Sequence, residues 1–349
     1  MPDVTTQSAA SNAAVTPVTR VLSGIQPTGN LHLGNLLGAI LRWVRMQEEA
    51  PCCFFLADLH SLSEHIPADT RRGAVRNMAA ALIASGIDPD KSVLFAQSDV
   101  PAHAELCWIL NGTARMGWLS RMTQWKDKSG KNKEGASVAL FDYPVLQAAD
   151  ILLYRPSHVP VGEDQKQHIE LTRDIATKFN LDTGTETFVL PEPFIGGGVA
   201  ARVMSLRDGS NKMSKSDPSD MSRINLIDSD EEIAAKIRKA RTDPEPLPGD
   251  PELLKERPEA RNLVGIMAAI TGESDAAILS RFEGQGFGAF KPALADALVE
   301  LIAPIRARYE ALVADSAELD RLLDKGAAKA IELAAPTLLA AKQAVGLGR

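Results

Sequence analysis

The chain has 349 residues, of which 45% are hydrophobic and 24% charged, close to the usage of ordinary globular proteins. This composition excludes a disordered, collagen-like or small disulfide-stapled protein, and at roughly 150 residues per domain the length predicts about two domains. The 45 acidic and 38 basic residues give a net charge of −7, so any nucleic-acid partner must bind a local basic patch, not a generally basic surface.

The three cysteines, Cys52, Cys53 and Cys107, form no paired framework and show no metal-ligand spacing. They indicate free thiols in a reducing compartment, so we expect a cytoplasmic protein without a metal site of its own. No apolar stretch reaches about 18 residues, so a membrane-spanning helix is not expected. Residues 1–19 are rich in Ser, Thr and Ala without the basic start and apolar core of a targeting peptide, and we interpret them as a short disordered tail.

Strand and helix patterns alternate at the start of the ordered sequence. Apolar runs bounded by turn residues predict strands at residues 21–25, 52–58 and 92–97. Amphipathic spacing predicts helices at about residues 33–49, 69–86 and 102–110. Asp69 is expected to cap the second of these helices. The alternation predicts βαβ units and a Rossmann-like α/β fold with a doubly wound parallel sheet.

The middle of the chain departs from this rhythm. Residues 125–136 carry four lysines and no apolar period, which predicts a mobile basic loop. A helix is expected at 141–154, a short strand at 159–161, and a further helix within 162–179. A last short strand at 203–206 precedes a loop rich in lysine and serine.

Only helical patterns remain after about residue 222. Ser229 and Glu232 have the spacing of a capping box at the start of the first of these helices. The predicted organisation is a Rossmann-like domain over residues 20–222 and an all-helical domain over residues 223–309. The final helix, at about residues 310–349, is expected to pack back on the first domain.

The turn after the first strand, residues 24–35, is the first place where the sequence suggests chemistry. In open α/β sheets, ligands bind beyond the carboxyl ends of the strands, and the N–H groups at the start of the next helix favour anions. Gly34 would let a phosphate approach the backbone, and His32 and Asn35 can donate hydrogen bonds to it. The turn lacks the G-x-G-x-x-G spacing, so a nicotinamide or flavin cofactor is not supported. Taken alone, such a turn is more often an ordinary loop.

A second candidate is the loop Lys212-Met213-Ser214-Lys215-Ser216. Two lysines three positions apart, with small hydroxyl residues beside them, suit the binding of a polyphosphate by ammonium groups and backbone amides. An isolated pair of this kind is more often a solvated basic loop, but the full pentapeptide is far less common by chance.

The two motifs together carry a family resemblance. HLGN (residues 32–35) resembles the HIGH signature of class I aminoacyl-tRNA synthetases, and KMSKS (residues 212–216) matches their second signature letter for letter. Further segments, residues 143–154 and 159–174 and the closing GLGR, resemble bacterial-type tryptophanyl-tRNA synthetases. The resemblance implies a homodimer that activates tryptophan with ATP and Mg²⁺ and transfers it to the 3′ end of tRNA(Trp).

The resemblance also assigns roles by matching positions. The ATP site is expected to comprise Gln26, Pro27, Thr28, Gly34, Asn35, Gly162, Glu163, Asp164, Val203, Lys212, Met213, Ser214, Lys215 and Ser216. Catalytic roles are expected for Lys212, Lys215, His32 and Gln26. Lys126 or Lys128 is expected to contact the ATP phosphates. The alternative is that the basic loop is only a solvated tip. The helical domain is expected to bind the tRNA anticodon, and the candidate contacts to tRNA phosphates are Arg115, Arg121, Arg238, Lys239 and Arg241.

Tryptophan is expected to bind to Asp150, Tyr143, Gln147, His60, Val159 and Val161. Asp150 would carry the specificity, because the indole N–H is the one polar handle of tryptophan and a carboxylate accepts it in a charge-assisted hydrogen bond. The alternative is that Asp150 only pairs with a nearby base. The other histidines, His103 and His168 among them, are expected to be packing or surface residues, and Trp43 and Trp108 core or interface residues.

Three alternatives stay open from the sequence. A tyrosyl-tRNA synthetase shares the architecture but usually carries G-S-D-Q where this chain has GEDQ at residues 162–165. A small-metabolite nucleotidyltransferase with an H-x-G-H turn would not need the helical half. A synthetase-like paralogue that binds RNA without catalysis is disfavoured, because Lys212, Lys215, Gly34 and Asp150 are all present.

Overall fold

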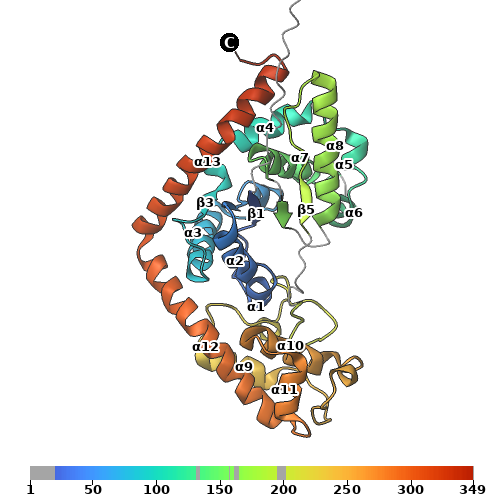
Figure 1. Cartoon of the computed structure of the whole chain (residues 1–349), viewed down its shortest axis with the longest axis vertical. Coiled ribbons are helices and arrows are strands. Elements are labelled where there is room, and N and C mark those ends of the chain that lie inside the picture. The colour runs from blue at the N-terminus through green and yellow to red at the C-terminus, as the bar shows by residue number, and fades with distance from the viewer. Residues whose placement is uncertain (1–19, 131–133, 157, 161–164, 195–201, 349) are drawn as a thin grey trace, which may run out of the picture.

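The computed structural model describes residues 20–130, 134–156, 158–160, 165–194 and 202–348 (Figure 1). The tail at residues 1–19 and the expected site residues Val161, Gly162, Glu163 and Asp164 lie outside the described residues. Within the described ranges, no single helix is long and apolar enough to cross a membrane. The consecutive helices Pro258–Thr271 and Asp275–Phe282 meet that requirement only together, with a bend of 111° between them.

A five-stranded parallel sheet forms the centre of the first domain, in the order β3-β2-β1-β4-β5. The strands are β1 (Val21–Ile25), β2 (Cys52–Leu56), β3 (Val93–Ala96), β4 (His158–Pro160) and β5 (Glu192–Phe194). The strand order reverses beside the central β1, so its carboxyl end lies at the point where such sheets bind ligands. The predicted doubly wound parallel sheet is confirmed, and β5 is a strand that the sequence patterns do not predict.

Helices cover both faces of this sheet, as the alternation of side chains on β2 requires. Phe54 packs in one cluster with residues of α2 and α3, whereas Phe55 packs in another with residues of α4, α7 and α8. The helices are α1 (Leu33–Asn35), α2 (Leu41–Glu49), α3 (Ala68–Ala84), α4 (Ala102–Asn111), α5 (Met116–Leu119), α6 (Thr123–Ser129), α7 (Val138–Leu153) and α8 (Lys166–Thr183). A π-helical turn, Leu36–Ile40, joins α1 to α2, so the helix predicted over residues 33–49 is locally widened.

Three predicted features are wrong. Residues 203–206 form no strand, because the chain turns back at once and Met204 makes only an isolated antiparallel bridge with Lys212. The basic loop predicted over residues 125–136 begins as helix α6, because the Trp125 ring packs edge-on against Phe141 with 4.8 Å between ring centroids. Asp69 does not cap α3: Pro67 is the N-cap, and Asp69 lies in the first turn, where a negative charge still favours the helix terminus.

The C-terminal part is helical in the described residues. Its helices are α9 (Asp230–Lys239), α10 (Pro258–Thr271), α11 (Asp275–Phe282), α12 (Phe287–Ala314) and α13 (Ser316–Ala344). The capping box is confirmed, since the Ser229 hydroxyl accepts from the Glu232 N–H and the Glu232 carboxylate accepts from the Ser229 N–H. In Figure 1, α9, α10, α11 and the start of α12 gather below the sheet, and α12 and α13 run back up beside it.

The last helix, α13, packs on β3, one of the two edge strands of the sheet. At Gly326 the two backbones approach so closely that a Cβ atom would lie 1.8 Å from the Leu94 carbonyl oxygen. Ion pairs flank this contact, from Arg76 to Asp320 at 2.7 Å and from Lys325 to Asp90 at 2.5 Å. The helix thus covers an edge that would otherwise expose unpaired backbone groups.

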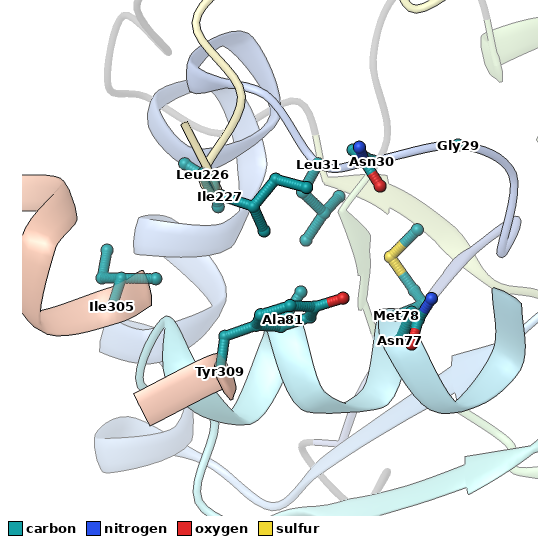
Figure 2. A pocket seen from close by; sticks show the side chains of 10 residues that line it. All are labelled: Gly29, Asn30, Leu31, Asn77, Met78, Ala81, Leu226, Ile227, Ile305 and Tyr309. Atoms are coloured by element: carbon teal, nitrogen blue, oxygen red, sulfur yellow. The ribbon is translucent and has the colours of Figure 1, made fainter. Parts of the chain in front are cut away.

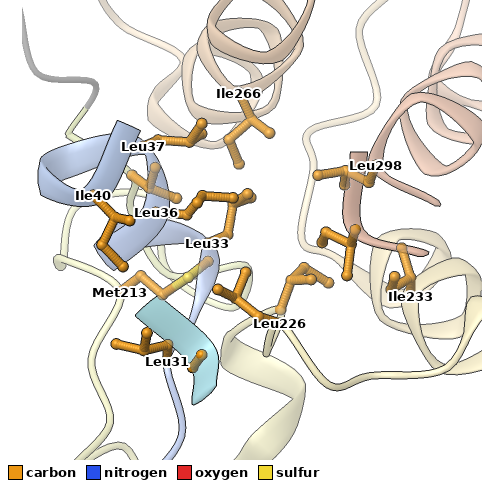
Figure 3. Close-up of a cluster of buried hydrophobic side chains, with 14 of the residues drawn as sticks. Leu31, Leu33, Leu36, Leu37, Ile40, Met213, Leu226, Ile233, Ile266 and Leu298 are labelled. Atoms are coloured by element: carbon orange, nitrogen blue, oxygen red, sulfur yellow. The ribbon is translucent and has the colours of Figure 1, made fainter. Parts of the chain in front are cut away.

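The sheet domain and the helical part share one hydrophobic core (Figure 3). Leu33, Leu36 and Leu37, on the turn and helix after β1, lie in one buried cluster with Ile266 of α10 and Leu298 of α12. A small cavity of about 20 Å³ remains where the turn at residues 29–31 meets α3 and α12 (Figure 2). That volume holds about one water molecule, so it is too small for a ligand. The helical part is therefore packed directly against the turn that opens the candidate site.

Candidate active site

The turn after β1 is held in place by the segment at residues 224–226. Leu33 N donates to the Ile224 carbonyl at 2.8 Å, and Leu226 N donates to the Leu31 carbonyl at 2.9 Å. The Asn35 side chain accepts from the backbone N–H of His32 at 3.1 Å. Asn35 therefore stabilises the turn through its carbonyl oxygen, in addition to any hydrogen bond that its amide group donates to a nucleotide.

His32 is buried within this turn, with 4% of its surface exposed. Its Nδ1 atom has no hydrogen-bond partner among the described residues. Burial and the positive charges of Lys215, Arg223 and Lys212 lower the pKa of His32 to about 4, so the ring is neutral near pH 7. A Cβ atom at Gly34 would lie 3.0 Å from this ring, a tight contact that favours glycine two positions after His32. A neutral histidine with a free nitrogen can hydrogen-bond a phosphate oxygen without carrying charge.

The lysine loop reaches the same turn from the other side. Lys215 Nζ donates to the Thr28 carbonyl oxygen at 2.7 Å. Burial lowers the pKa of Lys215 to about 8. Met213 anchors the loop: its side chain is buried in the shared core, and its N–H donates to the Val203 carbonyl at 3.0 Å. The structure thus brings the two sequence motifs together at the carboxyl end of β1.

A cavity of about 650 Å³ opens beside these motifs, at the carboxyl ends of β1 and β2. This volume lies in the range of pockets that bind small molecules. Six of the predicted site residues line it: Gln26, His60, Tyr143, Gln147, Asp150 and Val159. The others that the structure describes are not among the lining residues: Pro27, Thr28, His32, Gly34, Asn35, Val203, Lys212, Met213, Ser214, Lys215 and Ser216. The side chains of Val203 and Met213 are buried. A nucleotide can therefore contact these two residues only through their backbone, or after the loop that carries them has moved.

Asp150 is a fully buried carboxylate on the wall of this cavity. Its Oδ1 accepts from Gln97 Nε2 at 2.6 Å and lies 2.7 Å from His103 Nδ1, and its Oδ2 lies 2.8 Å from His60 Nε2. Burial alone would raise the pKa of Asp150, but the hydrogen bond from His103 and the interactions with His60 outweigh it and lower the pKa to about 2. The group is therefore ionised, and a carboxylate has about four lone-pair positions. The donors among the described residues leave one position on Oδ2 for a further donor in the cavity.

His103 and Gln97 are site residues that the sequence interpretation missed. His103 is fully buried, and its Nε2 lies 2.8 Å from the Tyr154 hydroxyl. The two contacts suit a ring that accepts from Tyr154 at Nε2 and donates from Nδ1 to Asp150. The only sequence signal was position, since Gln97 directly follows β3 and His103 opens the next helix. Polar residues at the carboxyl end of a parallel strand are candidates for a site.

Tyr143 and Gln147 form the polar rim of the cavity. The Tyr143 hydroxyl donates to Gln124 Oε1 at 2.9 Å and lies 2.8 Å from His168 Nε2, and burial raises the pKa of Tyr143 to about 12. Gln147 Nε2 donates to Gln165 Oε1 at 3.4 Å. His168 thus supports Tyr143, a role that the sequence interpretation did not give it. In the described ranges no cluster of three or more His, Cys, Asp or Glu side chains is placed to hold a metal ion.

Comparison with known proteins gives matches over nearly the whole chain. A family model described as tRNA synthetases class I (W and Y) matches residues 15–303. The chain is 59% identical over 328 residues to a tryptophan–tRNA ligase of Caulobacter vibrioides, covering 94% of this chain and 95% of that protein. A tryptophanyl-tRNA synthetase of Campylobacter jejuni, solved with ADP and tryptophan, matches with a TM-score of 0.81 and 36% identity, covering 94% and 100% of the two chains. The enzyme from Mycoplasma pneumoniae matches with a TM-score of 0.83 and 33% identity, covering 95% and 98%.

Proposed function

We propose, because this chain belongs to the bacterial-type tryptophanyl-tRNA synthetases of class I, that it joins L-tryptophan to tRNA(Trp) in two steps. In the first step the tryptophan carboxylate attacks the α-phosphorus of ATP, a new P–O bond forms, and pyrophosphate leaves. In the second step a hydroxyl at the 3′ end of the tRNA attacks the carbonyl carbon of the adenylate, an ester bond forms, and AMP leaves. The chain is an ATP-dependent ligase.

The observation that carries this proposal is the ionised Asp150 carboxylate in the wall of the 650 Å³ cavity. Its one remaining acceptor position suits the indole N–H of tryptophan, which leaves the rest of the ring for apolar contacts. Val159 and Ile151 line the cavity and would make such contacts, and Tyr143 and His60, which also line it, are proposed to lie near the amino end of the substrate. Phenylalanine has no donor to offer, so it would leave this acceptor position unpaired, which a buried site penalises.

On the ATP side, the proposed contribution of this chain is to position the nucleotide and to supply positive charge. Gln26 lines the cavity, and Lys215 already reaches the adjacent backbone at Thr28. Exchange of that carbonyl contact for phosphate oxygens would place an ammonium group against the developing charge of the leaving pyrophosphate. Lys212 supplies a second positive charge three positions away, and the neutral His32 supplies an uncharged donor.

We propose that Mg²⁺ enters as part of MgATP. Because the described residues contain no acidic cluster able to hold an ion, its ligands are expected to be phosphate oxygens and water. Bound in that way, Mg²⁺ neutralises phosphate charge. The lysines of the loop and Gln26 then orient the nucleotide, independently of any protein-held metal.

The helical part, residues 223–309, is the proposed anticodon-binding domain, and residues 310–349 belong with the catalytic domain of residues 20–222. The exposed Arg238 and Lys239 at the end of α9 are candidate contacts to tRNA phosphates. Arg241 forms an ion pair with Glu259, with 3.3 Å between Nε and Oε1. These cations supply the local basic surface that a protein of net charge −7 needs in order to bind RNA.

We also propose that the chain forms a homodimer. Trp108 on α4 is 79% exposed, and Met116 at the start of α5 is 72% exposed. The Arg115 guanidinium lies 5.2 Å from the centroid of the Trp118 ring in the same region, a pairing common in protein interfaces. Large apolar side chains at this exposure are typical of a surface that another subunit covers.

A cytoplasmic location is proposed on the chemistry of the cysteines. Cys52, Cys53 and Cys107 are free and buried. Burial raises the pKa of Cys52 to about 12 and that of Cys53 to about 11, so both remain unreactive thiols. Free, unreactive thiols without disulfides are typical of proteins in a reducing compartment.

Exchange of labelled pyrophosphate into ATP, measured with each of the standard amino acids in turn, tests this function. We expect exchange with tryptophan alone, because the Asp150 carboxylate in the cavity wall offers an acceptor that suits the indole N–H. Exchange with tyrosine in its place would favour the tyrosine enzyme, and no exchange with any amino acid would favour a non-catalytic paralogue. Either result would contradict the proposal.

A further inference from the structure

A buried lysine in the helical part of the chain joins two carboxylates. Lys236 on α9 has only 3% of its surface exposed. Its Nζ lies 2.6 Å from Asp228 Oδ2 and 2.6 Å from Asp220 Oδ2. Lysine is almost never buried to this extent unless it is paired. Lys236 belongs to neither signature motif and does not line the substrate cavity, so the activation step as described above makes no use of it.

The first carboxylate connects Lys236 to the turn after β1. Asp228 Oδ2 accepts from the backbone N–H of Asn225 at 2.8 Å, and Asp228 Oδ1 accepts from Asn225 Nδ2 at 3.0 Å. Asn225 forms an antiparallel bridge with His32, between the two backbone hydrogen bonds that hold the turn. The Asp228 side chain therefore fixes the segment on which the turn rests.

The second carboxylate connects Lys236 to the lysine loop, residues 212–216. Asp220 Oδ1 lies 3.1 Å from Arg223 Nη2. Arg223 Nη1 donates to the backbone carbonyl of Asp217 at 2.9 Å, and Asp217 directly follows the KMSKS motif. The end of the lysine loop is therefore held through Arg223 and Asp220.

The two connections form one charge-balanced network. Asn225 Nδ2 also donates to Asp220 Oδ1, at 3.0 Å, and so links the two carboxylates directly. Lys236 and Arg223 balance the two negative charges, and Lys236 contacts both carboxylates. Removal of one partner from a buried ion pair leaves a charge without compensation. Without the ammonium group, Asp220 and Asp228 repel each other, and each belongs to a segment that holds one of the two motifs.

We propose that Lys236 is a positioning residue of the activation step, which sets the distance between the turn after β1 and the lysine loop. The proposal rests on the function proposed above. Lys236 is buried outside the substrate cavity, so it acts through the two carboxylates and not on a substrate. The network holds His32 and Lys215 in register, so that both meet the same phosphate chain. A misplacement of about 1 Å at a reacting group can cost roughly 100-fold in rate, so an ion pair remote from ATP can control activation.

The first variant, Lys236→Met, removes the ammonium group and keeps an unbranched side chain. Tryptophan-dependent pyrophosphate exchange gives its kcat and KM, and the adenylate formed in the first turnover counts the active sites. We expect kcat per active site to fall at least tenfold while the KM for tryptophan stays within about twofold. The KM is spared because α7, which carries Asp150, packs on the opposite face of the sheet from the cluster that contains α9.

The matched control is Lys291→Met, which loosens the other end of the same helix. Lys291 on α12 donates to the backbone carbonyls of Arg238 and Ala240, at 3.2 and 2.7 Å. Its loss should lower the temperature of thermal unfolding and leave kcat per active site unchanged. A merely structural role of Lys236 would give the same result in Lys236→Met.

A second variant, Asp220→Ala, cuts the connection to the lysine loop at a side chain that is 56% exposed, so the fold should tolerate it. We expect kcat per active site to fall at least threefold, with the KM for tryptophan again unchanged. This variant alone decides the question if Lys236→Met does not fold.

Three results overturn the proposal. They are an unchanged kcat per active site in Asp220→Ala or in folded Lys236→Met, an equal fall in Lys291→Met, and a KM for tryptophan that rises as kcat falls. If the unmodified protein shows no tryptophan-dependent exchange, the proposed function itself has failed, which is a different result from a difference between variants.

Discussion

Replacing His103 with leucine removes one of the three donors that hold the Asp150 carboxylate in the described structure. A hydrogen bond to a charged group contributes about 1.5–3 kcal/mol. At about 1.36 kcal/mol per factor of ten, its loss is worth roughly a 10- to 150-fold fall in kcat/KM for tryptophan. The KM for ATP should change little, because His103 is buried beside Asp150 and not beside the lysine loop.

The same substitution has a defined effect on the pH profile. Burial raises the pKa of Asp150, and the interactions with His103 and His60 lower it to about 2. Without His103 the pKa rises, and the ionised form that accepts the indole N–H is lost at a higher pH. The acid limb of kcat/KM for tryptophan in pyrophosphate exchange should therefore move to higher pH in His103→Leu, while the limb for ATP stays in place.

Two variants make this prediction specific. His103→Gln keeps an amide that donates to Asp150 and an oxygen that accepts from Tyr154, so it should recover part of the lost activity and of the pH profile. Ile109→Val trims a buried apolar side chain on the same helix and controls for packing. The positioning role of His103 is refuted if His103→Leu folds normally, its kcat/KM for tryptophan stays within about twofold, and the acid limb of its pH profile does not move.

Two further predictions follow from Lys215 and Gly326. Because the pKa of Lys215 is lowered to about 8, its charge is lost as the pH rises through that value, and kcat/KM for ATP should fall above about pH 8 in the free enzyme. Lys215→Ala should slow exchange with little change in the KM for tryptophan, whereas Lys215→Arg should abolish the alkaline limb; an unchanged rate in Lys215→Ala would contradict the phosphate role. Gly326→Ala places a Cβ atom 1.8 Å from the Leu94 carbonyl oxygen and should cost about 1–3 kcal/mol or more of unfolding free energy. Thermal unfolding compares the stability of this variant with that of Gly73→Ala, where a Cβ atom meets nothing within 4 Å. Equal stability of the two variants would contradict the prediction, because α13 could then shift at no cost.

Local sequence patterns predict much of this protein because local interactions decide those parts. Apolar runs bounded by turn residues predict β1, β2 and β3, and the spacing of Ser229 and Glu232 predicts a helix start. These features depend on neighbours in the chain. The lysine content of residues 125–136 wrongly predicts a loop because it is also a local signal. The contact between Trp125 and Phe141 that accompanies α6 involves another helix, so no local pattern contains it.

The candidate site divides in the same way. The HLGN and KMSKS motifs and the position of Asp150 are visible in the sequence, because each is a short run or a single residue in a matched segment. Their meeting is not visible: Lys215 and Thr28 are 187 positions apart, and the fold brings Lys215 Nζ to 2.7 Å from the Thr28 carbonyl oxygen.

The surroundings of Asp150 show most clearly what tertiary structure adds. Its donors come from the turn after β2, the end of β3 and the start of α4, between 47 and 90 positions away along the chain. No local pattern selects His103 over the other histidines. The sequence by itself determined the fold class, the family and the charged groups available for chemistry, because these depend on residue type and spacing. The ionisation of Asp150 and the neutrality of His32 depend on burial and on distances between remote segments, which only the tertiary structure decides.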